Sequence, residues 1–359
     1  MLCPDQDLET HINQFLSPII QPLQIRDWYI LSSAFQKALR RANYSCALAS
    51  AQALLIANNK GFWRRLVTIA FEDFGLSDLN LTKHIVIAAK DGTWRKRMGG
   101  DLHVASFLIA QLVHTPTDRR IDDLYMLGIA AGHDRAFARV VESLIPSTRA
   151  LVHYASELSR TCERAIPRRS FRGLIAKACE DSLDRGADIL PDITELCRQG
   201  RKLSQCLLPL LLPETLKTAL VHNLETELIC NHFSDSQING ILSCAIDGFT
   251  GPGRQLLGRV IREDRSLWNL LSRNVGNSPG KAAAALLFCI EGGLLRRSLR
   301  DSSSGELYSA ALGCWSYLPP PSIPEALSLM RNLLPTLEER RRDLFAQMSQ
   351  QHQPSYNKE

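Results

Sequence analysis

Apolar residues recur every three or four positions along most of the chain, which is the spacing of one face of an α-helix. No stretch alternates apolar and polar residues between hairpin turns, as the strands of a half-exposed sheet would. The pattern therefore predicts an all-α protein, built as a multi-helix bundle or an irregular helical array.

Four helices are predicted in the first quarter of the chain. The Asn-Asn-Lys-Gly sequence at 58–61 is typical of a helix end followed by a loop. Gly75 and the Leu after it predict a Schellman ending for the third helix. A basic loop closed by Gly99-Gly100 is predicted after the fourth helix. The four predicted helices run from residue 28 to a turn at 43, and over 46–57, 62–74 and 82–90.

Twelve further helices are predicted beyond residue 100, and prolines such as Pro116, Pro146 and Pro213 supply most of the breaks between them. The predicted ranges are 101–113, 119–131, 134–143, 147–162, 168–185, 188–206, 213–231, 234–247, 252–272, 279–296, 304–315 and 324–350.

A chain of 359 residues favours two helical domains over one small one. We expect an N-terminal extension over 1–27, a first helical domain over 28–146, a second over 147–350 and a disordered polar tail over 351–359. A boundary at 167 is the alternative to the one at 146.

The composition, 45% apolar and 22% charged, is that of a globular protein rather than a disordered one. The longest apolar run, 206–212, is interrupted by Pro209, so no membrane span is predicted. Acidic residues, including Asp5 and Asp7, stand where a secretory signal would carry positive charge. These features predict a cytoplasmic protein without a membrane partner.

Ten cysteines are scattered along the chain, most of them within apolar helical patterns. This distribution favours buried free thiols over a disulfide framework. Cys230 and His232, with His222 before them, are the nearest approach to a zinc site, but the spacing is loose and a fourth ligand is missing. We therefore expect neither a metal nor another cofactor.

The net charge of +5 is unevenly distributed. Residues 1–27 hold one basic and four acidic residues, a net charge of −3. Residues 28–100 hold eleven basic and four acidic residues, a net charge of +7. The basic excess is therefore local.

The same basic region carries a resemblance to a known family. It contains SAFQKALR at 33–40, an Ala/Leu-rich stretch at 47–55 and WRRLVTIAFEDFGL at 63–76. This sequence resembles the helical collar that follows the ATPase module in the replication-associated recombination protein A family of clamp-loader-like AAA+ proteins. In that family one collar helix reads R-R-L-x-x-I-A-x-E-D-x-G-L-x-D. The likeness is strongest over 28–78 and continues weakly to 130.

The resemblance implies a domain that forms homo-oligomers and associates with replication or repair proteins. It does not extend to the ATPase, because the chain contains no G-x-x-x-x-G-K-[ST] sequence. The backbone N–H cradle, the Lys and the Mg²⁺-binding hydroxyl of a phosphate loop are all missing. We therefore expect no ATP hydrolysis and no other enzymatic activity.

The basic region also holds the best candidates for nucleic-acid contact. Cations can neutralise phosphates, and a tryptophan among them can stack on a base. A solvated basic face without a ligand is the alternative interpretation. The candidate DNA-binding residues are Arg64, Arg65, Lys90, Trp94, Arg95, Lys96 and Arg97.

Trp63, Glu72 and Asp73 are the candidate interface residues. The two carboxylates lie in the last turn of their predicted helix, where the helix dipole disfavours negative charge, so they need partners. An ion pair or hydrogen bond within the chain is one interpretation and a grip on a neighbouring subunit is another. A catalytic carboxylate pair is disfavoured, because adjacent helical residues point about 100° apart.

The glycine-rich segment 247–254 lacks the sequence of a phosphate loop. Thr250 as a helix N-cap, with Pro252 in the first turn, explains it structurally. The alternative is a ligand site, in which the charges of Asp247 and Arg254 flank one turn.

Gly292-Gly293 interrupts an apolar helical pattern, which indicates a kink or a close helix contact. Glu291 precedes this pair and completes a possible enzyme site with Asp247 and Arg254.

Three functions remain open at this stage. The leading hypothesis is a non-enzymatic, oligomerising DNA replication or recombination accessory protein. A helical protein-interaction scaffold without nucleic-acid contact is the alternative, and an enzyme with a site assembled from distant residues is the third. Partner identity and the role of 147–350 do not follow from the sequence.

Overall fold

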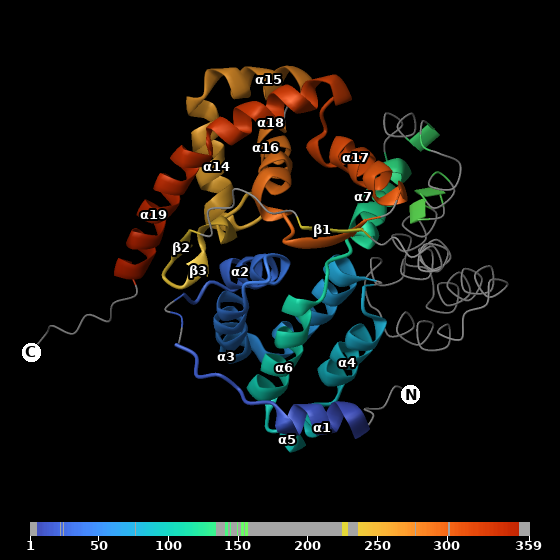
Figure 1. The fold of residues 1–359 in the computed structure, drawn as a ribbon. Helices are drawn as coiled ribbons and strands as arrows, with labels where there is room; N and C mark the ends of the chain where they lie inside the picture. Colours follow the sequence, from blue (N-terminus) through green and yellow to red (C-terminus); the bar gives the residue numbers. More distant parts are fainter. Residues whose placement is uncertain are drawn as a thin grey trace, which may run out of the picture. The chain divides into compact units, whose positions relative to one another are not determined.

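The computed structural model shows an all-α protein, as predicted, with two pairs of short strands as its only sheet elements in the described residues (Figure 1). The structure describes residues 6–21, 23, 25–75, 77–133, short stretches between 141 and 156, 225–228, 236–276, 278–300 and 302–351. The predicted helices at 134–143, 147–162, 168–185, 188–206 and 213–231 fall largely or wholly outside these residues, as does the tail from 352.

The chain divides into two compact units that interleave along the sequence. Each unit is made of three separate segments, whereas the predicted domains were consecutive, with boundaries at 27, 146 and 350. Apolar periodicity shows which face of a helix is buried and not which distant segment covers it, so it could not reveal the interleaving. Unit 1 comprises Met1–Ser17, Trp63–Ile229 and Arg296–Cys314, and unit 2 comprises Pro18–Phe62, Cys230–Leu295 and Trp315–Glu359.

Unit 1 is a group of helices with one pair of antiparallel strands, in which residue 225 pairs with residue 300. Its apolar core includes Phe71, Phe74, Ile85 and Leu108. Its elements are α1 (Gln6–Gln14), the end of α3 (Tyr44–Ile69), the π-turn η1 (Ala70–Phe74), α4 (Leu79–Lys90), α5 (Gly92–Arg97), α6 (Asp101–His114), α7 (Arg120–His133), β1 (Glu225–Leu228), β4 (Arg297–Arg300) and most of α17 (Ser302–Ser316).

Helix α3 is kinked at Asn58, the one residue in it with non-helical backbone angles. The Asn58 side chain accepts a hydrogen bond from the N–H of Gly61 at 2.8 Å and so caps the second half of the helix. A Cβ on Gly61 would lie 2.7 Å from the Trp28 ring, so a glycine is needed there. Instead of the predicted loop at 58–61, the helix is interrupted at Asn58 alone.

Gly75 ends the third predicted helix with a positive φ of 45°, as expected for a terminating glycine. The predicted Schellman ending is wrong, since the last turn widens into the π-turn η1 and the Gly75 N–H bonds to the Ala70 carbonyl, five residues back. A π-turn accommodates one residue more than an α-helical turn.

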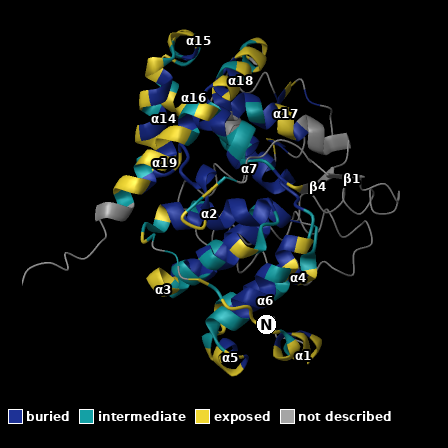
Figure 2. Cartoon of the chain, turned by 60° about the vertical axis from the view of Figure 1, so that its left-hand side comes forward, coloured by how far each residue is buried: buried dark blue, intermediate teal, exposed yellow. Residues whose placement is uncertain are grey.

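Unit 2 is built around α2, which is buried over most of its length (Figure 2). The Asp27 side chain starts α2 by accepting bonds from the first N–H groups of the helix. The elements of the unit are α2 (Trp28–Arg40), the first part of α3, β2 (Gln237–Ile238), β3 (Ile241–Leu242), the 3₁₀ turn η2 (Ser243–Ala245), α14 (Gly251–Glu263), α15 (Arg265–Val275), α16 (Pro279–Leu287), the π-turn η3 (Phe288–Gly292), η4 (Pro320–Ser322), α18 (Ile323–Asn332) and α19 (Leu334–Gln351).

Two apolar clusters hold unit 2 together. One joins α14, α15, α16, α18 and the start of α19 around residues such as Leu271, Leu287 and Met330. The other joins α2 to the β2–β3 hairpin and the later turns of α19, through Ile30, Ile241 and Phe345. Burial of this apolar area is the main term that stabilises the unit.

Several segments predicted as single helices are divided into two helices or form strands instead. The range 252–272 is two helices, because Asp264 ends one and caps the next by accepting the Leu267 N–H. The range 324–350 is also two helices, α18 and α19, which meet at Leu333. The predicted helix at 234–247 is a hairpin followed by η2, and residues 225–228 form a strand.

The hairpin has an identifiable cause in the sequence. Asn239 and Gly240 both have positive φ, 51° and 82°, as a tight two-residue hairpin turn requires. An Asn-Gly pair is the strongest local signal for such a turn. No helix in the described ranges is long and apolar enough to cross a membrane.

Two glycines of α14 give a matched test of this packing. A Cβ on Gly253 would lie 2.0 Å from the Asp247 carbonyl oxygen, whereas a Cβ on Gly258 meets no atom within 4 Å. Gly253→Ala should lower the free energy of unfolding by about 1–3 kcal/mol through overpacking. Gly258→Ala should raise it by up to about 1 kcal/mol through helix propensity. Urea unfolding followed by circular dichroism measures both, and equal effects would contradict this account of the turn.

Candidate functional site

The basic segment after α4 is a helix, and the prediction of a loop there is wrong. Asp91 caps α5 by accepting the Trp94 N–H at 2.8 Å. The Trp94 side chain is only 2% exposed, and its indole Nε1–H donates to Glu9 of α1 at 2.8 Å. Trp94 is therefore not available to stack on a base while α1 is in this position.

Arg95 is also buried rather than free to contact phosphate. Its guanidinium donates to the Asp101 carboxylate and to the Ala88 carbonyl, and it stacks over the Trp63 ring with 4.5 Å to the ring centroid. An arginine held by a carboxylate, a carbonyl and an aromatic face is a structural group. The prediction that Arg95 binds DNA is therefore wrong for the structure as it stands.

Four of the seven predicted DNA-binding residues are exposed, and we call them the basic surface: Arg64, Lys90, Lys96 and Arg97. The stacking of Arg95 on Trp63 places α5 beside the turn of α3 that carries Arg64. Lys90 ends α4, directly before α5. The basic surface thus comes from three adjoining elements, and Arg65 is half-buried next to it.

Helix α1 lies against α5 and α6 of the same unit. Its Leu8 and Ile12 are buried, and the Ile12 carbonyl accepts a bond from His103 Nε2 at 2.9 Å. After the helix, the Phe15 ring packs edge-on against Phe107. Glu9 accepts bonds from both Trp94 and Arg97, the latter at 3.1 Å. The negative N-terminal region therefore neutralises part of the basic surface.

The predicted interface residues are mostly internal. Trp63 is buried, and its Nε1–H donates to Asp101 at 3.1 Å. Asp73 is fully buried and pairs with Arg119 at 3.6 Å, which confirms an ion pair within the chain. Glu72 is half-buried in η1. Trp63 and Asp73 are wrong as residues of a subunit contact, because both are buried and bound to partners within the chain.

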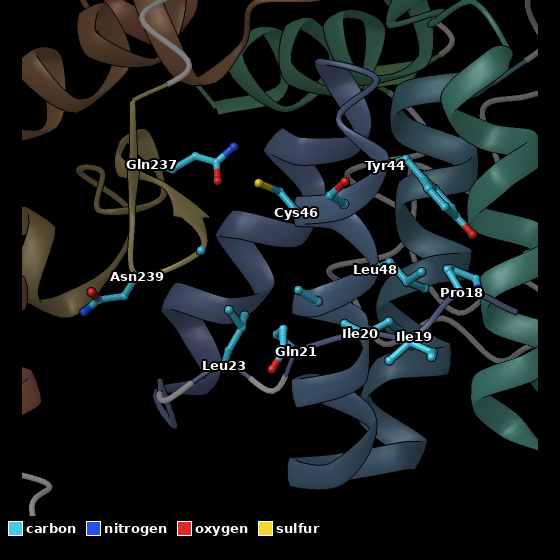
Figure 3. A pocket seen from close by; sticks show the side chains of 13 residues that line it. Pro18, Ile19, Ile20, Gln21, Leu23, Tyr44, Cys46, Leu48, Gln237 and Asn239 are labelled. Carbon is cyan, nitrogen blue, oxygen red and sulfur yellow. The ribbon is translucent and has the colours of Figure 1, made fainter.

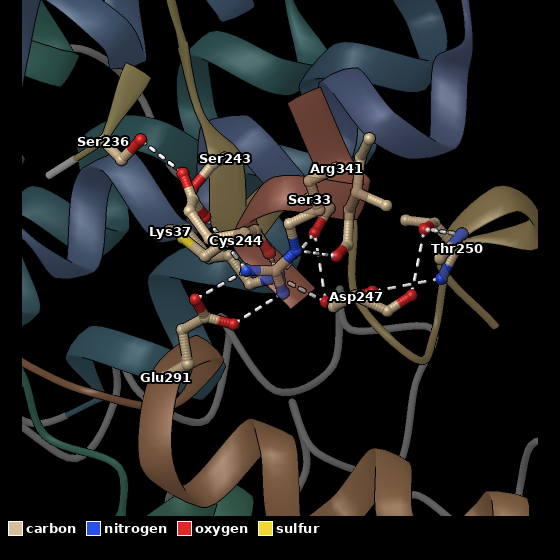
Figure 4. Close-up of polar contacts among 12 residues, drawn as sticks. Ser33, Lys37, Ser236, Ser243, Cys244, Asp247, Thr250, Glu291 and Arg341 are labelled. Atoms are coloured by element: carbon tan, nitrogen blue, oxygen red, sulfur yellow. Dashed lines mark hydrogen bonds and ion pairs between the residues drawn. The ribbon is translucent and has the colours of Figure 1, made fainter. Parts of the chain in front are cut away.

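A network of buried charges lies within unit 2 (Figure 4). Lys37 of α2 forms an ion pair with Asp247 and also donates to Ser33 and the Cys244 carbonyl. Asp247 accepts the N–H groups of Phe249 and Thr250 at 2.9 and 3.0 Å. Burial alone would raise the pKa of Asp247, but the Lys37 charge and these hydrogen bonds together lower it.

A second ion pair in the same network joins η3 to α19. Arg341 donates two bonds of 2.7 Å to Glu291 and a third, of 2.9 Å, to the Ile246 carbonyl. Burial opposes the charged form of Glu291, yet the Arg341 charge and its bonds lower the pKa of this carboxyl below its usual value. Both groups are therefore ionised inside the protein.

This network is structural rather than a ligand site. Arg254 is exposed, and its side chain contacts the Gly248 carbonyl at 3.5 Å, so Asp247 and Arg254 do not converge on one space. The predicted N-cap is confirmed, since Thr250 accepts the Gly253 N–H and Pro252 stands in the first turn. Burial raises the pKa of the nearby Cys244 thiol, which keeps it protonated and unreactive.

The network also explains part of the basic excess of residues 28–100. Lys37, Arg40 and Arg41 come from α2 and its C-cap and are buried. Arg40 donates to the Gly292 carbonyl at 2.9 Å, and Arg41 to the Glu291 carbonyl at 3.3 Å. Three of the eleven cations are thus used to bind distant segments of unit 2, and with Arg95 four are internal.

Gly292 confirms the predicted close contact, since a Cβ there would lie 2.9 Å from Lys37 Cε.

A groove of about 490 Å³ in unit 2 was not predicted (Figure 3). It lies between the extended segment of residues 18–21 and 23, the start of α3 and the β2–β3 turn, and its lining is mainly apolar. Tyr44 lies at its edge, and burial raises the pKa of this phenol. The extended segment shows no helical or strand period, so no sequence pattern indicates the groove.

Comparison with known proteins places the chain in no group: no family model, curated protein or solved structure matches it. Within the described part of the chain, no three His, Cys, Asp or Glu side chains are grouped so that they could hold a metal ion. The loosely spaced Cys230, His232 and His222 lie outside the described residues.

Neighbouring arginines of α19 test the buried network. Arg341 is 1% exposed and Arg342 is 64% exposed. Arg341→Met leaves Glu291 buried and unpaired, so it should lower the free energy of unfolding by about 3–5 kcal/mol. Arg342→Met should change it by less than about 0.5 kcal/mol. Chemical unfolding at neutral pH measures the difference.

The acid dependence of the same variants gives a second measurement. Asp247 and Glu291 have lowered pKa values in the folded protein, so their ionised forms stabilise the fold. This stability is fully present above the pKa of an unfolded carboxyl, and it is lost as the pH falls through the lower pKa values of the folded protein. The Arg341→Met protein should therefore lose less stability than the wild type on acidification. A parallel loss in both proteins would contradict the proposed role of the pair.

Proposed function

We propose that the chain is a non-enzymatic accessory protein of DNA replication or recombination, which self-associates through its collar-like helices and contacts DNA through the basic surface. The proposal is supported by the resemblance over 28–78 and by the exposed cations of unit 1. It assigns the chain no cofactor.

The observation that carries the proposal is the position of the four cations of the basic surface. They are exposed, whereas Lys37, Arg40, Arg41 and Arg95 are buried, and they come from adjoining elements. Cations grouped in this way bind phosphate with an affinity that depends on released counterions.

The proposal of a non-enzymatic role has its own support. The carboxylates of the enzyme alternative, Asp247 and Glu291, are bound to Lys37 and Arg341, and burial keeps the Cys244 thiol protonated. General acid–base catalysis needs a group that can reach its substrate.

Trp63 and Asp73 are buried, so self-association is assigned to other residues. In the collar-like region, Tyr29 of α2 and Ile56 of α3 are large apolar side chains with 70% and 78% exposure. The contact of Trp28 with Gly61 brings these ends of the two helices side by side. A second copy of the chain is the partner that would cover them.

A helical interaction scaffold without DNA contact is the second candidate. The specific observation in its favour is exposed apolar surface outside the collar-like region, namely Leu16, Ile19 and the groove beside the latter. A failure of DNA binding would make this the leading function.

Self-association is tested by light scattering at tens of micromolar protein. The wild type should form a dimer or a larger oligomer. The double variant Tyr29→Lys/Ile56→Lys should be a monomer, because desolvating charge at the contact is unfavourable. Leu16→Lys/Ile19→Lys is the matched control and should remain associated. A strictly monomeric wild type would remove this part of the proposal.

DNA binding is tested by a salt titration with labelled single-stranded and duplex DNA. Arg64→Ala/Lys90→Ala/Lys96→Ala should weaken binding and reduce the slope of log affinity against log salt by roughly 2 to 3, for three lost phosphate contacts. Arg95 stays unchanged, because its removal would disturb the fold.

The control variant removes the same charge elsewhere. Arg265, Arg273 and Arg331 are exposed residues of unit 2, and replacing all three with Ala should leave the slope closer to that of the wild type. Equal slopes for both triple variants would mean that the basic surface is only a solvated face.

A further inference from the structure

Helix α1 occupies part of the surface to which we assign DNA binding. Glu9 accepts one hydrogen bond from the Trp94 indole at 2.8 Å and another from the Arg97 guanidinium at 3.1 Å. A carboxylate that bonds a cation and an aromatic N–H has the same charge and acceptor atoms as a phosphate group. Glu9 therefore takes the place that a nucleic-acid phosphate would take on α5.

The charge of the N-terminal region matches this role. Residues 1–27 carry a net charge of −3, against +7 for residues 28–100. Asp7 and Glu9 are both in the first turn of α1, and Glu9 is the one of the two that bonds to α5. The opposite charges favour the contact, in which Glu9 is the acidic residue that reaches Trp94 and Arg97.

The attachment of α1 is weak enough to be reversible. The helix has nine residues and buries two apolar side chains, Leu8 and Ile12. Helices of this length are marginal without packing, and elements with few buried contacts open at low free energy. The Glu9–Arg97 pair is partly exposed, with Arg97 63% accessible, so it contributes little on its own.

Displacement of α1 would uncover a different kind of surface from the one seen with α1 in place. The Trp94 indole would lose its hydrogen-bond partner Glu9, and Arg97, one turn further along α5, would lose its ion pair. An exposed indole among cations binds unpaired bases by stacking, while the cations hold the backbone. A duplex offers the cations its phosphates but offers the indole no free base.

We propose that α1 is a displaceable acidic cover that competes with single-stranded nucleic acid for Trp94 and Arg97. The proposal rests on the function proposed above, and it adds a substrate class and a means of regulation. The apparent affinity for a single strand is the intrinsic affinity reduced by the fraction of molecules in which α1 is displaced.

The test uses the full chain with Glu9→Gln, and with Asp7→Asn as the matched control. Both remove one negative charge from α1, but only Glu9→Gln weakens the contact with α5. Glu9→Gln should raise the affinity for oligo(dT) at low salt by about threefold or more over Asp7→Asn, with a smaller gain for a duplex of equal length. Hydrogen exchange of the α1 amides should be faster in Glu9→Gln than in Asp7→Asn.

The variant Arg97→Gln distinguishes the release of α1 from a general effect of net charge on DNA affinity. It breaks the same contact from the other side, so α1 amides should again exchange faster, yet oligo(dT) affinity should fall because a phosphate contact is lost.

Each other outcome overturns a defined part of the proposal. Equal gains for Glu9→Gln and Asp7→Asn, or unchanged exchange of α1, would rule out the cover while leaving DNA binding intact. A gain for the duplex as large as that for oligo(dT) would rule out the preference for single strands. No binding by any of the proteins at low salt would overturn the proposed function and the cover together.

Discussion

Unit 2 depends on charges placed where water cannot reach them. Lys37, Asp247, Glu291 and Arg341 come from α2, the turn before α14, η3 and α19, four segments that are far apart in the sequence. Removing a charge from water costs several kcal/mol, and only a partner with good geometry offsets the cost. Loss of any one of these charges would therefore leave its partner buried and uncompensated, in a unit whose apolar clusters otherwise hold it together.

The pairing of buried charges explains why distant segments of the chain come together in unit 2, which the apolar pattern does not. Periodicity correctly predicted an all-α fold and the helices α4 and α6, and residue type predicted the Thr250 cap, because these depend on neighbours in sequence. It failed where partners are distant, since nothing local to α2 shows that residues 241–247 and 341–345 cover it. The hairpin at Asn239-Gly240 was a different failure, because its local signal was present and was outweighed by apolar spacing.

The candidate site was predictable as a region and not as a set of residues. The local charge of +7 indicated the region that carries the basic surface, and four of the seven predicted DNA-binding residues are exposed there. Charge counting could not show that Trp94 and Arg95 are buried, because their partners Glu9 and Asp101 lie on other helices. The same count included Lys37, Arg40 and Arg41, which bind the Asp247 carboxylate and the carbonyls of Gly292 and Glu291, all much later in the chain.

The two π-turns share a geometry that sets a limit on how the sequence can change. In η1 and η3 alike, a glycine N–H bonds to a carbonyl five residues back, and the carboxylate two positions before that glycine binds an arginine, Asp73 with Arg119 and Glu291 with Arg341. Deleting one residue from either turn would restore a regular α-helix and rotate the helix before the deletion by about 100° relative to the segment after it. The helix would become more regular. However, the carboxylate could no longer reach its arginine while the apolar face of the helix stays packed in the core. Single-residue deletions should therefore be far less tolerated at these two helix ends than substitutions, even though each would remove a local irregularity.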